Sequence, residues 1–303
     1  MFSLLARYSS VCLVLAAIAG FLFPAASNAV FPYLPYVLFL LMLFTLLGIN
    51  QPTLVKALCR PRAWIYAVVH TALLTVCSCG IAYALGSSKE TILAVSGIAA
   101  TGSLFATPAI ARSVGLDALE AMSYTITSTL LKPLVLYINL TLFSDDAFAL
   151  NVSGYIARLL IFIFGPMLLS ALVHHFVSDK HLKPIHSKLS QYTIILVFSF
   201  PFGLIGAFRE YWETDMLSAL YMLATGFGIC VLFFVVGFVI YGRKGKEAAL
   251  IAGITSGNRN VLLTYTIAGA ALGPVYLPLI GALQLPIYLQ PLAVTWFVRR
   301  FGK

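Results

Sequence analysis

The chain has 303 residues, of which 61% are hydrophobic and 10% are charged, and its mean hydropathy is +0.97. Soluble domains carry about 25% charged residues and fewer apolar ones, so this composition excludes a water-soluble enzyme, a secreted scaffold and a disordered chain. The formal charge of +9 is typical of the basic inner loops of an integral membrane protein, and it predicts a lipid bilayer rather than a nucleic acid as the partner.

Ten apolar runs have the length, roughly 20 residues, that crosses the hydrocarbon layer. In the first half they are Tyr8–Ala26, Leu34–Gly48, Ala63–Leu85, Thr91–Val114 and Glu120–Phe143. In the second half they are Ser153–Val177, Ser190–Phe208, Asp215–Tyr241, Ala248–Leu272 and Pro274–Val298. The first run, preceded by Arg7 and followed by small residues up to Ala29, would also suit a cleavable signal peptide. We predict an all-α membrane protein with ten transmembrane helices.

The lysines and arginines of the loops are distributed unevenly. If the N-terminus is cytoplasmic, the loops around Lys56, Lys183 and Lys244 lie inside, and only Lys89, Arg158 and Arg209 lie outside. Basic residues collect in cytoplasmic loops. We therefore predict a multi-pass protein of the cell membrane with both termini in the cytoplasm.

Histidines and cysteines do not form a recognisable metal site. The sequence places one histidine group in or beside the inner loop between the sixth and seventh runs, and we interpret it as part of a solvated loop: His174, His175, His181 and His186. Cys77 and Cys79 lack the spacing of metal ligands and lie in an apolar run. We predict no cofactor and no metal.

The ten runs divide into two sets of five, residues 1–143 and residues 153–303. An odd number of crossings per half means that the second half enters the membrane in the opposite direction, as in the inverted repeats of many secondary transporters. Lys132-Pro133 in the fifth run matches Gln290-Pro291 in the tenth at an offset of 158 residues. We therefore predict two inverted five-helix repeats.

The fourth and ninth runs carry glycine and short polar residues at the middle of the bilayer. These are Thr101, Gly102, Ser103 and Pro108 in the fourth run, and Thr255, Ser256, Gly257, Asn258, Arg259 and Asn260 in the ninth. Unwound backbone at that depth must be buried in protein or line a cavity, and paired interruptions indicate the binding site of a transporter. We predict helix breaks at Gly102, Pro108 and Gly257. Close helix packing through small residues is the alternative, but it leaves the Asn-Arg-Asn sequence unexplained.

Two cations, Lys132 and Arg259, lie near the middle of their runs, and no acidic residue lies inside the core of any run. A cation at the bilayer centre costs about 2.5–3.5 kcal/mol on the insertion scale. Its partners would be the carbonyl groups at the helix breaks or an anion that arrives as the substrate; a wrongly bounded run is the third alternative. Burial disfavours the charged form of a lysine, whereas nearby oxygen atoms or a bound anion favour it.

The chain resembles the bile acid:sodium symporter family, within the wider bile/arsenite/riboflavin transporter group. The resemblance rests on Ser128 four residues before Lys132-Pro133, on the Thr255–Asn260 segment followed by Leu262, and on the glycine-ended run Leu40–Gly48. It implies ten helices in two inverted sets of five, with the fourth and ninth helices discontinuous and crossing. It also implies sodium-coupled uptake of an organic anion.

The departures from the family pattern concern sodium. Where the family has a glutamate, a glutamine and a threonine as sodium ligands, this chain has Thr255, Arg259 and Lys132. Of the other ligands, Ser128 and Asn260 are retained. Two cations would repel sodium strongly at low dielectric. We interpret them as fixed charges that stand in for the ions, so sodium coupling is doubtful.

The sequence therefore predicts a secondary transporter of small organic anions that works by alternating access, and it predicts no catalytic residue. Arg259, Asn258 and Asn260 would donate to the anion, because the arginine fork can bind both oxygens of a carboxylate. The other predicted binding residues are Lys132, Ser128, Thr255, Ser256, Thr101, Ser103 and Gln290. The alternatives are an ordinary sodium-coupled symporter and, in a different class, a membrane sensor or channel-like protein. The motifs of intramembrane or hydrolytic enzymes are absent from the sequence.

Overall fold

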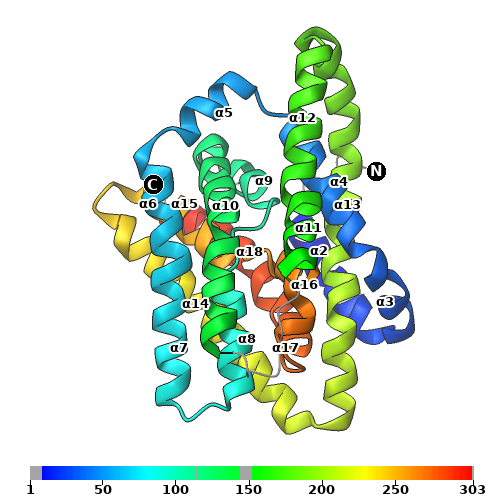
Figure 1. Ribbon diagram of the computed structural model, residues 1–303, viewed down its shortest axis with the longest axis vertical. Coiled ribbons are helices and arrows are strands. Elements are labelled where there is room, and N and C mark those ends of the chain that lie inside the picture. Colours follow the sequence, from blue (N-terminus) through cyan, green and yellow to red (C-terminus); the bar gives the residue numbers. More distant parts are fainter. Residues whose placement is uncertain (1–8, 114, 144–151, 302–303) are drawn as a thin grey trace.

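The computed structural model describes residues 9–113, 115–143 and 152–301. In these ranges the regular structure is helical, and the single β-type pairing is an isolated bridge between Ser103 and Arg259. The helices form an elongated bundle, as Figure 1 shows. The predicted all-α class is confirmed.

The N-terminal segment forms three helices, α2 (Ser9–Leu22), α3 (Pro24–Val30) and α4 (Leu34–Leu47). A short 3₁₀ turn joins α3 to α4, so that they make one long apolar segment. The end predicted for the first run, Tyr8–Ala26, is wrong. The proline at the start of α3 lacks an N–H and suits a first helical turn, so the first helix ends before it.

The third predicted run is one long helical segment with an irregular middle. It follows the short helix α5 (Gln51–Leu58) and consists of α6 (Pro61–Val68), a π-helical turn (Val69–Leu73) and α7 (Leu74–Ala84). Such turns interrupt the regular backbone ladder and occur frequently at functional sites.

The fourth predicted run, Thr91–Val114, is interrupted as expected. Helix α8 (Lys89–Ala99) ends before the middle, and seven residues separate it from the start of α9 (Thr107–Ser113). Pro108 does not break a helix in its middle, because it lies in the first turn of α9, where a missing N–H is harmless. The long helix α10 (Ala118–Phe143) follows.

The second half begins with the same kind of irregular helix. It consists of α11 (Val152–Leu159), a π-helical turn (Leu160–Phe164) and α12 (Gly165–Phe176). The predicted connection between the two halves spans residues 144–152; Val152 already belongs to α11, and residues 144–151 lie outside the described residues.

Helix α13 (Asp179–Thr214) corrects the prediction of a histidine-rich loop. Val177 and Ser178 alone separate α12 from α13, so that His181 and His186 lie within the helix. A helix of 36 residues is about 54 Å long, whereas the hydrocarbon layer is about 30 Å thick. The helix is thus longer than a crossing needs, and its polar first turns are helical instead of forming a loop.

The last five helices are α14 (Met216–Gly242), α15 (Lys246–Gly257), α16 (Val261–Ala268), α17 (Tyr276–Ala282) and α18 (Gln284–Phe301). The ninth predicted run is thus interrupted between α15 and α16, as the sequence indicated. A short 3₁₀ turn (Gly269–Ala271) follows the end of α16 and precedes α17.

Six of the described helical segments are long and apolar enough to cross a membrane. They are Pro24–Leu47, Pro61–Ala84, Ala118–Phe143, Ser153–Phe176, Met216–Gly242 and Tyr276–Trp296. Two shorter apolar segments are Val11–Leu22 and Val261–Ala271. These segments indicate a membrane protein. The parts of an interrupted helix are each shorter than a full crossing, so the ten-helix arrangement stays a prediction.

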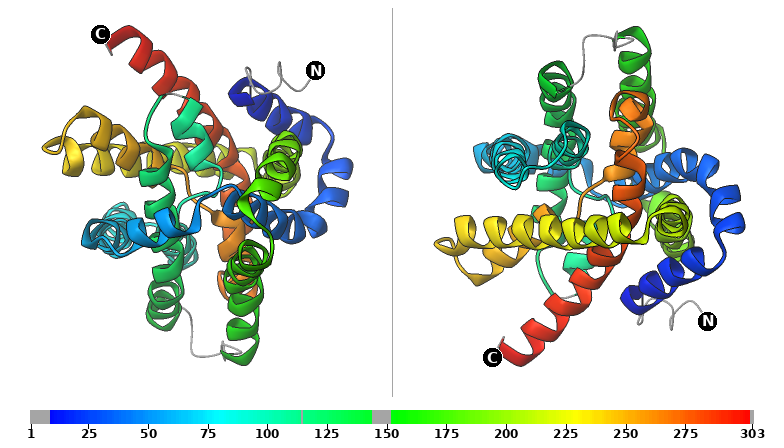
Figure 2. Two further views of the ribbon diagram at one scale, coloured as in Figure 1. Left: turned by 90° about the horizontal axis from the view of Figure 1, so that it is seen from above. Right: turned by 90° about the horizontal axis from the view of Figure 1, so that it is seen from below.

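Close approach through small residues determines how the helices pack. Helices α2, α3 and α4 wrap around α13, as both views of Figure 2 show. A Cβ atom at Gly206 of α13 would lie 2.6 Å from the Ser27 hydroxyl of α3, and one at Gly237 of α14 would lie 2.7 Å from the Ala252 carbonyl of α15. Glycine at these positions lets the backbones pack in contact, which is typical of membrane helices.

A labelling experiment tests the predicted topology. Figure 1 shows α5 at one end of the bundle and the α7–α8 and α13–α14 connections at the opposite end. In a cysteine-free version, Lys56→Cys should react with an impermeant maleimide from the cytoplasm, and Lys89→Cys and Glu213→Cys from outside. Labelling of Lys89→Cys from the cytoplasm would show that the orientation is reversed.

Candidate functional site

The two interrupted helices meet at their breaks. The Leu104 N–H donates to the Asn258 carbonyl at 2.8 Å, and the Asn260 N–H donates to the Gly102 carbonyl at 2.9 Å. Ser103 and Arg259 form the isolated antiparallel bridge between these bonds. Each break therefore satisfies backbone groups of the other, which is the condition for unwound backbone at membrane depth.

Arg259 lies at the centre of this crossing. Its Nη1 donates to the Thr101 carbonyl and its Nη2 to the His70 carbonyl, both at 2.7 Å, and the side chain is 2% exposed. The guanidinium carbon also lies 4.7 Å from the centre of the Phe233 ring, in a cation–π contact. Thr101 follows the C-terminal end of α8, where free carbonyls and the helix dipole favour a cation. In the structure, Arg259 thus binds carbonyl groups at the break, one of the two partners that the sequence left open.

His70 is a buried residue that the sequence analysis missed. It lies in the π-helical turn after α6, and its Nδ1 is hydrogen-bonded to the Ser256 hydroxyl. The ring of Tyr66 stacks on it with centroids 4.1 Å apart, and the Tyr66 hydroxyl is 3.2 Å from the same serine oxygen. An ionisable residue inside the apolar run Ala63–Leu85 was the available signal, because such residues usually serve a function.

Helix α10 is held against the break of the fourth run. The Ser103 N–H donates to the Ser128 hydroxyl at 3.2 Å, and this hydroxyl donates to the Tyr124 carbonyl at 2.7 Å. A Cβ atom at Gly102 would lie 2.8 Å from both the Cα and the N of Thr129. Gly102 is therefore required for close approach of α10.

Gly257 is the last residue of α15, and close packing again explains why this residue is a glycine. A Cβ atom there would collide with the carboxamide of Gln290, which packs directly on the backbone at the break. Gln290 is thus brought to the crossing, as predicted. Glycine can adopt a positive φ at a helix break, but neither Gly257 nor Gly102 does so. The reason for glycine at both positions is therefore the close contact and not the backbone angle.

Lys132 lies on α10 one helical turn after Ser128, so both share one face. It is fully buried, and its Nζ has no hydrogen-bond partner within the part of the chain that the structure describes. An unpaired buried polar group costs free energy, and such groups in native proteins usually have a ligand, ion or water as partner.

Unsatisfied amide groups accompany this lysine. Asn258 has no partner for either amide atom among the described residues, and Asn260 has none for Nδ2. The Oδ1 of Asn260 accepts a bond from the Leu263 N–H at 3.3 Å and caps α16. A void of about 10 Å³ lies beside Arg259 and Asn260, enough for about one water molecule. The crossing is therefore closed but polar in this conformation.

The remaining predicted hydroxyls turn back on their own helices or across the bridge. Thr255 Oγ1 bonds the Ile251 carbonyl, and Thr101 Oγ1 donates to the Ile98 carbonyl at 2.9 Å. Ser103 Oγ donates to the Asn258 carbonyl at 3.3 Å. These three residues shape the crossing but do not present a free hydroxyl to a ligand in this conformation.

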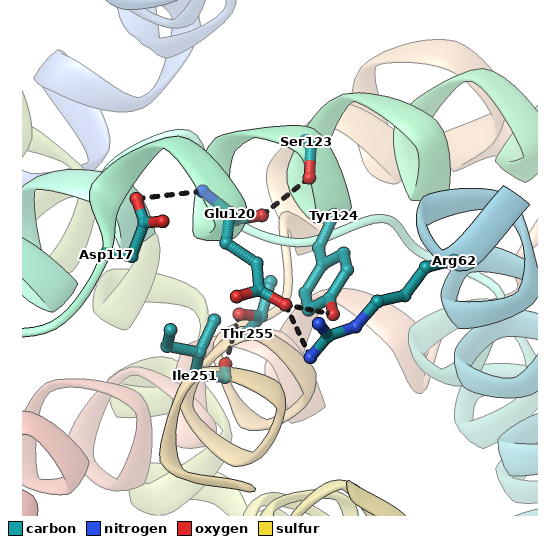
Figure 3. A network of polar contacts seen from close by, with 7 residues as sticks. All are labelled: Arg62, Asp117, Glu120, Ser123, Tyr124, Ile251 and Thr255. Carbon is teal, nitrogen blue, oxygen red and sulfur yellow. Dashed lines mark hydrogen bonds and ion pairs between the residues drawn. The ribbon is translucent and has the colours of Figure 1, made fainter. Parts of the chain in front are cut away.

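A second polar network lies at the N-terminal end of α10, and it too was missed from the sequence. Figure 3 shows Glu120 between Arg62 of α6, at 2.7 Å, and the Tyr124 hydroxyl, which donates to the carboxylate at 2.5 Å. The ring of Tyr124 stacks on Tyr66 with centroids 4.1 Å apart. Through Tyr66 this network continues to Ser256, so an aromatic column connects the ion pair to the crossing.

No protein-family model matches the chain, and no curated protein matches it. In the ranges that the structure covers, no group of three or more His, Cys, Asp and Glu residues could hold a metal ion. The function must therefore be inferred from the geometry of the crossing.

Substitution of two glycines tests how tightly the crossing is packed. In Gly102→Ala the new methyl group would meet the backbone of α10, which cannot move locally, and we expect a loss of about 1–3 kcal/mol in stability. Gly80→Ala is the matched control, because a Cβ atom on this exposed face of α7 would have no neighbour within 4 Å. The melting temperature in detergent should fall for Gly102→Ala and should stay equal or rise for Gly80→Ala. Equal melting temperatures would contradict the close contact.

Proposed function

We propose that the protein is a secondary transporter that moves small organic anions across the cell membrane by alternating access. The observation that carries the proposal is the crossing of two interrupted helices, joined by the bridge between Ser103 and Arg259. Interrupted helices whose broken ends meet in a buried polar site are the construction in which transporters bind substrates and ions.

The order of elements in the two halves supports an inverted repeat. The interrupted pair α8 and α9 is followed by α10, which contains Pro133, and the interrupted pair α15 and α16 is followed by the segment of α17 and α18, in which α18 contains Pro291. The residues before these prolines, Lys132 and Gln290, are buried and have unpaired polar atoms among the described residues. In the proposed inverted repeat, Lys132 and Gln290 occupy equivalent positions.

Arg259 takes the place of a coupling ion in this proposal. It binds two backbone carbonyls with a fixed positive charge, at a position where the family that the sequence resembles has a sodium ligand. A sodium ion close to this guanidinium would be repelled strongly in the low dielectric of the protein interior. Transport without sodium follows from this arrangement.

The substrate anion would bind to the groups that the crossing leaves unpaired. Lys132 supplies a positive charge, and the amides of Asn258 and Asn260 supply hydrogen-bond donors. An organic anion would satisfy all three and would neutralise part of the excess positive charge. The site is small and closed in this conformation, so binding requires the opening that alternating access provides.

Neutralising Arg259 tests the role of the fixed charge. Arg259→Gln should abolish or strongly reduce uptake into proteoliposomes, because the Thr101 and His70 carbonyls lose charged donors worth about 1.5–3 kcal/mol each. The matched control is Arg209→Gln, which breaks a partly exposed ion pair with Glu213 and should transport normally.

Two further readouts make the result decisive. Size-exclusion chromatography shows whether each variant is folded, and Arg259→Lys keeps the charge if the glutamine variant aggregates. Normal uptake by a folded Arg259→Gln protein would contradict the proposal.

The coupling ion is tested by exchange of the external cation. A labelled anion found by thermal-shift screening should enter at the same initial rate in sodium and in choline buffers. Lys132→Met should reduce uptake at least about tenfold, because the apolar methionine side chain has no charge and no hydrogen-bond donor for the anion. Lys56→Met, at an exposed position on α5, should have no effect.

Other outcomes would change the mechanism. A steep, saturable requirement for sodium would return the protein to ordinary sodium symport. Uptake that follows a proton gradient and is uncoupled in Lys132→Met would show that the lysine titrates during transport. Absence of counterflow of labelled substrate would exclude a carrier and favour a sensor or a channel.

A further inference from the structure

A groove on the side of the bundle lies behind the crossing and shares Gln290 with it. It has a volume of about 510 Å³, within the range of small-molecule sites, and it is formed by α14, α15 and α18. Its lining is apolar and aromatic except for one carboxamide, and it includes Phe234, Leu250, Leu289, Val294, Trp296 and Gln290.

The groove is deep at one side and open at the other. Cys230 and Gln290 on its floor are 4% and 9% exposed, whereas Val231 and Trp296 at its rim are 58% and 64% exposed. In both views of Figure 2, α14 and α18 diverge towards the C-terminus. The exposed face of α14 next to the groove is apolar and includes Val235 and Val239. A ligand would therefore enter from the hydrocarbon layer.

Gln290 determines which ligand the groove fits. Both its Nε2 and its Oε1 have no hydrogen-bond partner among the residues described, although the side chain is nine-tenths buried. A carboxamide offers donors and an acceptor together, and a hydroxyl group can satisfy both. No Lys, Arg or His lines the groove, so a charged headgroup would be buried without a counter-charge.

We propose that the groove binds a membrane-dissolved molecule with a long apolar body and a terminal hydroxyl group, such as a long-chain alcohol. The apolar body fills the space between α14 and α18, and the hydroxyl group bonds to the Gln290 carboxamide, which lies buried beneath the floor of the groove and turns from Gly257 towards the ligand to meet it. Because the Gln290 carboxamide packs on Gly257, the ligand would sit directly behind the break of α15. The proposal does not depend on the identity of a transported anion.

Trp296 at the rim of the groove serves as the reporter. In a Trp64→Phe, Trp212→Phe background it is the remaining tryptophan, and bromine atoms quench its fluorescence on contact. In nanodiscs, a dibrominated octadecanol should quench Trp296 saturably, with half-maximal quenching at an about fivefold to tenfold lower concentration than dibrominated octadecane. This factor corresponds to one or two hydrogen bonds. Gln290→Leu should remove the difference between the probes.

Two further variants keep the test decisive if Gln290→Leu does not fold. Ala293→Phe fills the groove from its exposed side and should abolish the preference for the alcohol, whereas Val235→Phe, on α14 outside the groove, should retain it. Equal quenching by both probes would mean that ordinary bilayer lipid fills the groove, and a preference that survives in Ala293→Phe or Gln290→Leu would mean that the groove and its carboxamide do not cause it. Either result would overturn the proposal. Stronger quenching by dibrominated stearate at alkaline pH would overturn the neutral headgroup.

Discussion

The contact between the Arg259 guanidinium and the carbonyls of Thr101 and His70 joins three elements that are distant in the chain. It connects the break after α15, the end of α8 and the π-helical turn after α6. Broken helices leave backbone carbonyls without partners, and hydrocarbon offers none, so each break must be satisfied within the protein. A buried cation likewise needs oxygen atoms around it. The free-energy cost of the unpaired carbonyls and that of the buried cation are therefore both reduced by the same contact.

The packing around this point depends on residues that have almost no side chain. Gly102 lets α10 approach the fourth-run break, and Gly257 lets Gln290 pack on the ninth-run break. On the third side, Tyr66 and His70 stack and share the hydroxyl of Ser256. The crossing is therefore enclosed by contacts that fix its geometry, and opening it requires rigid movement of whole helices rather than of single side chains.

Charge separates the two candidate sites. At the crossing, Lys132 and Arg259 bring positive charge. The aromatic column connects the crossing to the ion pair of Arg62 and Glu120, which lies at the N-terminal end of α10. This positive charge is the reason why we propose an anion as the ligand of the crossing. The lateral groove has no charged side chain in its lining and fits a neutral molecule. Gln290 lines the groove and packs on Gly257 at the crossing, so these two residues lie between the two sites.

The sequence by itself determined the helical membrane class, the two interruptions and the positions of the buried cations, because composition, run length and glycine placement act locally along the chain. It could not determine which partner Arg259 takes, since the Thr101 and His70 carbonyls are 158 and 189 residues away and backbone carbonyls have no sequence signature. The tertiary structure also decided that His181 belongs to a helix and that Lys132 has no partner among the described residues. Such pairings depend on which helices pack together, and that is a property of the whole fold.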